Sequence, residues 1–162
     1  MGDLILNSLE IRNFRGFQHL TIEHLGRVNL IVGKNNIGKS SLLEALQLYA
    51  SRASTPTFIW DIMRSRREIK RPFVNVRDML AALKYLFYGR NEIKPGLQPI
   101  QIGPVAAPQE ILSIAIDWSV SELREGTIHT RPLEQGEDYT TDNLIPRFTI
   151  QAAGTTLSYP ID

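Results

Sequence analysis

Two short stretches near the N-terminus alternate apolar and polar residues with a period of two. Leu9 and Ile11 alternate with polar neighbours, and Leu20 and Ile22 repeat the same pattern. Because successive side chains of a strand point to opposite faces of a sheet, this alternation is typical of half-buried strands. The two runs therefore predict an antiparallel hairpin, with its turn around Gly16.

An almost continuous apolar run at residues 28–32, with the sequence Val-Asn-Leu-Ile-Val, follows the hairpin. Such runs are typical of strands that are covered on both faces, as in the middle of an α/β sheet. Apolar residues then recur at helical spacing over residues 40–52. The chain thus predicts a strand, a short loop and a helix in succession.

The pattern predicts two more helices, at residues 58–70 and 75–87. Pro72 is expected to end the first, because a residue that precedes proline disfavours helical geometry. The second has Asn75 as its expected N-cap and Gly89 as its C-terminal stop.

The C-terminal half predicts mainly strands. Four prolines and two glycines fall within residues 90–109 and predict an irregular connection inside the domain. Alternating patterns beyond it predict strands at residues 110–120 and 127–131 and a hairpin over residues 148–159. Together these elements predict an α/β fold in one domain over residues 1–162, with a mixed sheet, an antiparallel N-terminal hairpin and flanking helices.

Composition excludes several classes of protein. The chain has 162 residues, 43% of them hydrophobic, and a formal net charge of +1, so no overall field attracts nucleic acid or an acidic membrane. It contains no cysteine, which excludes disulfides and thiolate metal sites. No apolar run is long enough to span a membrane. The N-terminus lacks the pattern of a signal peptide, so the expected location is the cytoplasm.

One motif carries chemistry, the pattern G-x-x-x-x-G-K-[ST] at residues 33–40. Its backbone N–H groups are expected to wrap a polyphosphate, and Gly33 and Gly38 permit the close approach that this wrap requires. Lys39 is expected to act as the catalytic lysine by placing its charge at the β- and γ-phosphates, and Ser40 is the expected Mg²⁺ ligand. The helix that begins there adds free N–H groups and the positive end of its dipole. The predicted nucleotide-binding residues of this loop are Gly33, Lys34, Asn35, Asn36, Ile37, Gly38, Lys39, Ser40 and Ser41.

The motif follows a predicted strand and opens a predicted helix, which is the context that this chemistry requires. The alternative is a Gly-Lys turn that only links a strand to a helix. No guanine-reading motif of the NKxD type is present, so the expected ligand is ATP, bound with Mg²⁺.

The block LEIRNFRGF, followed by LGRVNLIVGKNNIGKSSLLEAL, resembles the N-terminal lobe of the SMC/RecF/OLD group of ABC-type ATPases. It looks most like prokaryotic OLD-like AAA-type ATPases, several of which act in phage defence. In that group the hairpin helps to wall the adenine and ribose, which places Arg12, Asn13 and Arg15 near the edge of the nucleotide. The alternative for these three is a polar turn on the surface. Many ABC loops carry Gly where this chain has Asn36, and Asn is the other residue that best tolerates a left-handed backbone.

Parts that the resemblance leads us to expect are missing from the sequence. Hydrolysis needs an apolar strand that ends in Asp, often followed by Glu, and the comparable run ends at Asp117, followed by Trp118. A signature of the LSGGQ type and a switch histidine are absent. In the family these parts come from a C-terminal lobe, so the chain resembles part of an ATPase head that hydrolyses little ATP by itself. The candidates for a Mg²⁺-contacting glutamine are Gln98, Gln101, Gln109 and Gln151.

The resemblance implies that ATP binding drives head-to-head dimerisation, with a second copy or a complementary ATPase lobe as partner. It further implies a nuclease or another DNA-handling effector, in DNA repair or phage defence. Two rival functions stay open, a non-catalytic nucleotide-binding assembly module and a small P-loop kinase. The hairpin ahead of the loop disfavours the kinase. A basic cluster indicates either a contact with DNA or, as we favour, a solvated helix face; it consists of Arg64, Arg66, Arg67, Lys70 and Arg71.

Overall fold

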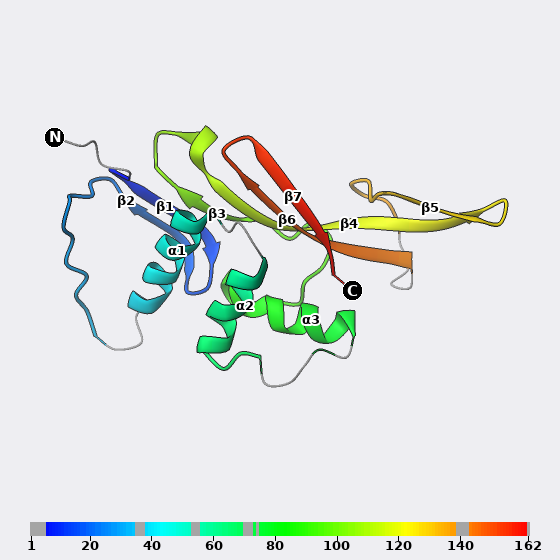
Figure 1. The fold of residues 1–162 in the computed structure, drawn as a ribbon, viewed down its shortest axis with the longest axis horizontal. Helices are drawn as coiled ribbons and strands as arrows, with labels where there is room; N and C mark the ends of the chain where they lie inside the picture. The colour runs from blue at the N-terminus through cyan, green and yellow to red at the C-terminus, as the bar shows by residue number, and fades with distance from the viewer. Residues whose placement is uncertain are drawn as a thin grey trace.

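A seven-stranded sheet extends across the molecule, with the three longer helices gathered along one side of it (Figure 1). The computed structural model describes residues 6–34, 38–52, 56–69, 73, 75–138 and 143–161. The strands follow the order β2-β1-β3-β4-β6-β7, and β5 pairs with β4 outside this path. The strands are β1 (Leu9–Phe14), β2 (Phe17–Ile22), β3 (Ile100–Gly103), β4 (Leu112–Arg124), β5 (Thr127–Pro132), β6 (Leu144–Ala152) and β7 (Thr155–Pro160).

The predicted N-terminal hairpin is confirmed. β1 and β2 pair antiparallel in a register that sets Leu9 opposite Ile22 and Phe14 opposite Phe17. Arg15 and Gly16 form the turn, and Arg15 adopts a left-handed backbone with φ 51°. The apolar side chains of β1 point into the core, as the period-two pattern requires.

β3 forms inside the stretch that its prolines and glycines predict to be irregular. It joins the hairpin to the rest of the sheet, because it pairs with both β1 and β4. Ile100 and Ile102 are fully buried. At Gly103 a β-carbon would lie 2.9 Å from the Cα of Ile111, so only glycine fits there without a shift of the backbone. A four-residue strand between Pro99 and Pro104 is too short to show a period, which explains why the pattern missed it.

The four C-terminal strands confirm the predictions from alternation, although β4 and β6 are longer than predicted. β4 pairs with β6 over Ser113 to Val120, and from Ser119 to Arg124 it also pairs with β5. Beyond Val120, β5 is the one strand that pairs with it among the described residues. The end of this β4–β5 hairpin therefore projects from the body of the sheet (Figure 1).

The predicted helices are present but shorter in two cases. The second ends at Ser65 instead of residue 70, and Arg67 takes a left-handed backbone with φ 58° just beyond it. The third has Asn75 as its N-cap, confirmed by a 2.9 Å hydrogen bond from the Asp78 N–H to the Asn75 side chain. Its C-cap is Lys84 and not Gly89, because short 3-10 turns follow. The helices are α1 (Lys39–Ser51), α2 (Pro56–Ser65) and α3 (Val76–Leu83), and the 3-10 turns are η1 (Lys84–Leu86), η2 (Tyr88–Arg90) and η3 (Pro108–Glu110). The predicted helix stop at Pro72 lies outside the described residues.

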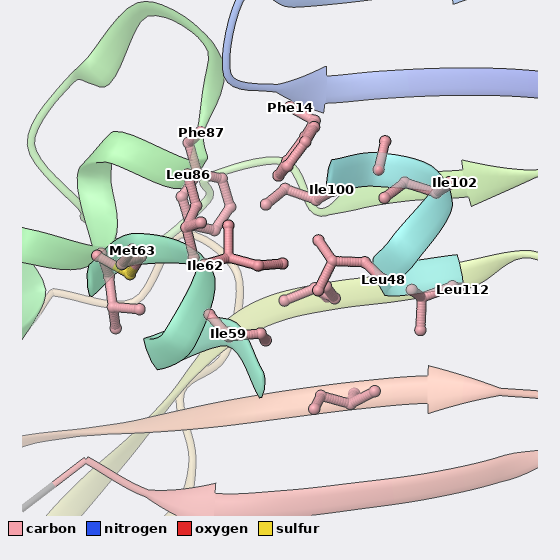
Figure 2. Close-up of a cluster of buried hydrophobic side chains, with 14 of the residues drawn as sticks. Phe14, Leu48, Ile59, Ile62, Met63, Leu86, Phe87, Ile100, Ile102 and Leu112 are labelled. Atoms are coloured by element: carbon pink, nitrogen blue, oxygen red, sulfur yellow. The ribbon is translucent and has the colours of Figure 1, made fainter. Parts of the chain in front are cut away.

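The core lies between the sheet and the helices (Figure 2). The sheet contributes side chains from β1, β3 and β4, and the helical side contributes Leu48, Ile59 and Met63. Phe14 and Phe87 are the largest fully buried side chains, and an isolated bridge joins their backbones. Within the described ranges, no helix combines the length and apolar content needed to cross a bilayer.

The strand predicted at residues 28–32 is wrong. This segment forms no strand and loops away from the sheet (Figure 1). Val28 is 92% exposed, Leu30 is 87% exposed and Val32 is 75% exposed. Every strand pairing among the described residues is antiparallel, so the sheet is not mixed. The rest of the predicted architecture, an α/β lobe with an N-terminal hairpin and flanking helices, is confirmed.

Candidate functional site

The predicted phosphate-binding loop leads directly into α1. Gly38 is the N-cap of this helix and has φ 99°, a conformation that other residues rarely adopt. A β-carbon at Gly38 would lie 3.0 Å from the ring of Phe17. The backbone conformation therefore favours glycine here, and a β-carbon would also press against the end of the Phe17 ring. The predicted site residues Asn35, Asn36 and Ile37 lie outside the described residues.

Lys39 folds back across the loop. Its Nζ donates hydrogen bonds of 2.5 Å to the Gly33 carbonyl and 2.6 Å to the Lys34 carbonyl. These two bonds hold the beginning of the loop close to the first turn of α1. The ammonium charge is thereby fixed at the N-terminal end of the helix, where the helix dipole is also positive.

The first turn of α1 presents donors and hydroxyl groups. Its first backbone bond runs from the Leu42 N–H to the Gly38 carbonyl, which leaves the N–H groups of residues 39–41 outside the helical ladder. The Ser40 side chain is exposed, whereas Ser41 is buried and accepts a 3.3 Å hydrogen bond from Nη2 of Arg66. Free N–H groups, a lysine charge and an exposed hydroxyl form the set of groups that binds a polyphosphate with its metal.

A buried network of ion pairs fixes α1 against the hairpin turn. Glu44 forms an ion pair with Arg15, whose Nε lies 2.6 Å from its carboxylate, and it accepts a hydrogen bond of 2.5 Å from Nε of Arg66. Nη1 of Arg15 also pairs with Glu68 at 2.6 Å. The Arg15 side chain is only 4% exposed, and its backbone N–H donates to the Leu86 carbonyl. The site thus combines groups from the hairpin, α1 and the segment after α2.

The sequence analysis missed this network. One signal was present, because Glu44 lies in an otherwise apolar stretch of the helix, four residues after Ser40. The pairing of Arg66 with Glu44 also shows that the basic cluster is not wholly a solvated face, although Arg64 keeps to an exposed pair with Asp61.

The resemblance places three hairpin residues at the edge of the nucleotide. The structure places them in two different surroundings. Arg15 is buried in the ion-pair network, while Arg12 pairs with Glu10 at 2.8 Å and Asn13 donates to the Gln98 carbonyl at 2.5 Å. Arg12 and Asn13 line a cavity of about 560 Å³ that also contains Gln98 and Gln101. The hydrogen bond from Arg12, together with the contact from His19, lowers the pKa of Glu10. Two of the four candidate glutamines therefore lie beside the hairpin.

A second Mg²⁺ ligand does not emerge from the described residues. Asp117 is exposed on β4, in register with Arg147 of β6. No three His, Cys, Asp or Glu side chains come together as a metal site within the described ranges. The assignment of Mg²⁺ to Ser40 accordingly stays a prediction.

Comparison with known proteins identifies the family. The sequence model of the AAA ATPase domain matches residues 4–118, which cover the hairpin, the loop, all three helices and the start of β4. The chain belongs to the AAA ATPase domain family. Membership supports nucleotide binding by this domain. No solved structure gives a significant match.

Curated relatives point the same way. The chain is 51% identical over 47 residues to the uncharacterized protein MJECL10 of Methanocaldococcus jannaschii, covering 29% of this chain and 22% of that protein. It is 30% identical over 119 residues to an ATP/GTP phosphatase of Helicobacter pylori, covering 73% of this chain and 29% of that protein. The chain is 42% identical over 48 residues to a DNA replication and repair protein RecF from a Picosynechococcus species, covering 30% of this chain and 12% of that protein.

These matches confirm the predicted kinship with the SMC/RecF group of P-loop ATPases. The domain is therefore an ATP-binding ATPase domain of RecF-like type. The chain spans less than a third of the length of these relatives. The activity and partners of the whole protein, and the closer likeness to OLD proteins, are accordingly matters for proposal.

Proposed function

We propose that the loop at residues 33–40 binds ATP with Mg²⁺ and that its occupancy switches the assembly of an ATPase head. The observation that carries this proposal is the convergence of Lys39, the Ser40 hydroxyl and the N–H groups of residues 39–41, which lie outside the helical ladder, at one end of α1. In this reading Ser40 holds the metal, and Lys39 exchanges its two carbonyl partners for phosphate oxygens. Mg²⁺ would supply a positive charge that neutralises the β- and γ-phosphates.

The exposed segment at residues 28–32 supports a role in assembly. A β-prone apolar run this exposed is uncommon in a stable surface, because it leaves apolar area in water and backbone groups without strand partners. Beside it lies a hollow of about 520 Å³ that Leu42 and Leu46 of α1 help to line. We infer that a complementary ATPase lobe, or a second copy in a head dimer, covers this surface when nucleotide is bound.

The biological role that follows is DNA processing or phage defence in the cytoplasm, with a nuclease or another effector coupled to the head. Its support is the similarity to RecF proteins and, more finely, the OLD-like character of the loop sequence. Arg66, a member of the basic cluster, contacts Ser41 in the first turn of α1.

Calorimetry tests nucleotide binding directly. Mg·ATP is titrated into the 162-residue chain and into Lys39→Ala, with Arg124→Ala at the exposed end of β4 as a control for the loss of one charge. We expect binding by the parent and the control and at least a tenfold loss in Lys39→Ala, as estimated from one strong charge-assisted contact (about 1.5–3 kcal/mol). Equal heats in all three proteins would refute the proposal.

The rival function, a non-catalytic assembly module, rests on the exposed position of Asp117 and on the absence of a cluster of three metal-binding side chains among the described residues. Single-turnover hydrolysis measured with the full complex separates the two. Bound ATP that is never cleaved, although it promotes assembly, would favour the rival. Cleavage that disappears in Lys39→Ala favours the ATPase.

A further inference from the structure

A cavity of about 620 Å³ opens between α3 and the place where β4 meets the beginning of β6. We call it the α3 cavity. Val76 and Leu80 of α3 line one wall, Trp118 and Pro146 line the sheet side, and Ile93 lies between them. Its volume falls in the range of small-molecule sites, about 300–1,000 Å³. None of its lining residues belongs to the phosphate-binding loop or to α1.

The rim of the α3 cavity is positively charged. Arg77 and Lys84 lie seven residues apart, on the same face of the helical segment as Leu80, and Lys94 lies on the facing segment. The one acidic residue of the lining, Glu92, pairs with Lys94 at 2.9 Å. Among the described residues, no carboxylate pairs with Arg77 or Lys84, so two positive charges at the rim are not balanced by a salt bridge.

Trp118 adds its aromatic ring to the apolar wall. Its Nε1 is closed to solvent, so the indole contributes apolar surface to the cavity. The charged groups of the lining are cationic, apart from Glu92, which pairs with Lys94. A ligand that completes this set must bring acceptor atoms and negative charge.

We propose that the α3 cavity binds a small organic anion with an apolar body. The anionic group lies between Arg77 and Lys84. The apolar body packs on Leu80, Trp118 and Pro146. Because the lining is mainly apolar and the charge is confined to the rim, a carboxylate or phosphate ester with a hydrocarbon or aromatic portion fits better than an inorganic anion.

The indole N–H signal of Trp118 in NMR spectra provides the test. The probe is 4-phenylbutyrate, and its neutral match is 4-phenylbutanol. The chain has two tryptophans, so the peak that disappears in Trp118→Phe assigns the reporter. We expect a saturable shift of this peak with the anion and binding about tenfold weaker with the alcohol, as estimated from losing contacts with two partly exposed charges.

Two double variants complete the experiment. Arg77→Gln/Lys84→Gln should lower the affinity for 4-phenylbutyrate by about tenfold, on the same estimate for the loss of two charge contacts. Arg64→Gln/Arg124→Gln, which removes two exposed arginines elsewhere, should leave its affinity unchanged, and circular dichroism checks that both variants fold. No shift up to the solubility limit, equal binding of the alcohol, or unchanged affinity in Arg77→Gln/Lys84→Gln would each overturn the proposal. So would a Trp118 shift produced by a single-stranded oligonucleotide and not by the anion. The outcome is independent of ATP binding at the loop.

Discussion

The sequence predicts strands equally clearly at residues 9–22 and at residues 28–32. The first region forms a buried hairpin, whereas the second forms no strand and is exposed. In the hairpin, Leu9, Ile11 and Phe14 are fully buried, because β3 lies beside β1 and the helices cover the face. In the segment, Val28 and Leu30 are almost fully exposed. Burial therefore depends on the presence of a partner strand and a cover, and not on the local pattern alone.

The largest effect that tests this contrast is expected at Phe14. Phe14→Ala removes a fully buried ring from the centre of the core and should lower the free energy of unfolding by about 3–5 kcal/mol. Leu30→Ser, at a residue that is 87% exposed, should change it by less than about 0.5 kcal/mol. Urea unfolding of both variants gives the comparison. A large loss in Leu30→Ser would mean that the segment is covered within this chain.

The next effect concerns the ion pairs that hold the hairpin turn to α1. Glu44→Gln leaves the guanidinium of Arg15, which is 4% exposed, without one of its two carboxylates. The expected loss is about 3 kcal/mol, because breaking a buried pair leaves an uncompensated charge. Asp61→Asn breaks the exposed pair with Arg64 and serves as the matched control, with an expected change below about 1 kcal/mol. Similar losses of stability in both variants would contradict a stabilising role for the buried ion pairs of Arg15.

A smaller effect on stability, with a larger effect on binding, is expected at Gly38. Gly38→Ala places a β-carbon at φ 99° and 3.0 Å from the Phe17 ring, at a cost of about 1–2 kcal/mol. Gly126→Ala, at φ 79° with open space around it, carries the backbone cost without the contact, and it lies in the turn between β4 and β5. Differential scanning calorimetry compares stability, and Mg·ATP titration should show impaired binding only for Gly38→Ala.

The smallest effect is a pH response in the β4–β5 hairpin, a second exposed region. Hydrogen bonds from Arg131, with help from the Glu134 N–H, lower the pKa of Glu137 to about 2. Since the ordinary value is 4.5, the contact stabilises the folded hairpin above pH 4.5 and is lost as the pH falls toward 2. Amide exchange of β5 should therefore speed up across this window. Glu137→Gln should reduce the change but not abolish it, because hydrogen bonds from Arg124 and Arg131 also lower the pKa of Glu122 on β4. A Glu137 carboxyl that titrates near its ordinary pKa would contradict the contact.

Much of the fold could be predicted from the sequence because its signals are local. The hairpin, α1, the Asn75 cap and the C-terminal strands each follow from a period or a capping residue within a few positions. The same holds for the phosphate-binding motif, whose spacing is fixed within eight residues.

The remainder depends on contacts between distant residues. β3 is identified as a strand by its pairing with β1 and β4, and its own four residues give no pattern. The ion pair between Arg15 and Glu68 joins positions 53 residues apart. The exposure of residues 28–32 depends on what packs against them. Neither periodicity nor propensity contains this information, so the pattern gave the wrong answer there.

The two hydrogen bonds of Lys39 have a consequence for which anions the loop accepts. An incoming ligand must replace the Gly33 and Lys34 carbonyl oxygens, so its measured affinity is the difference between new and existing bonds. A lone chloride offers too few acceptors to make that exchange favourable, whereas a chain of phosphates offers many at once. Under the proposed function, the two bonds of Lys39 would therefore favour polyphosphates over the abundant simple ions of the cell.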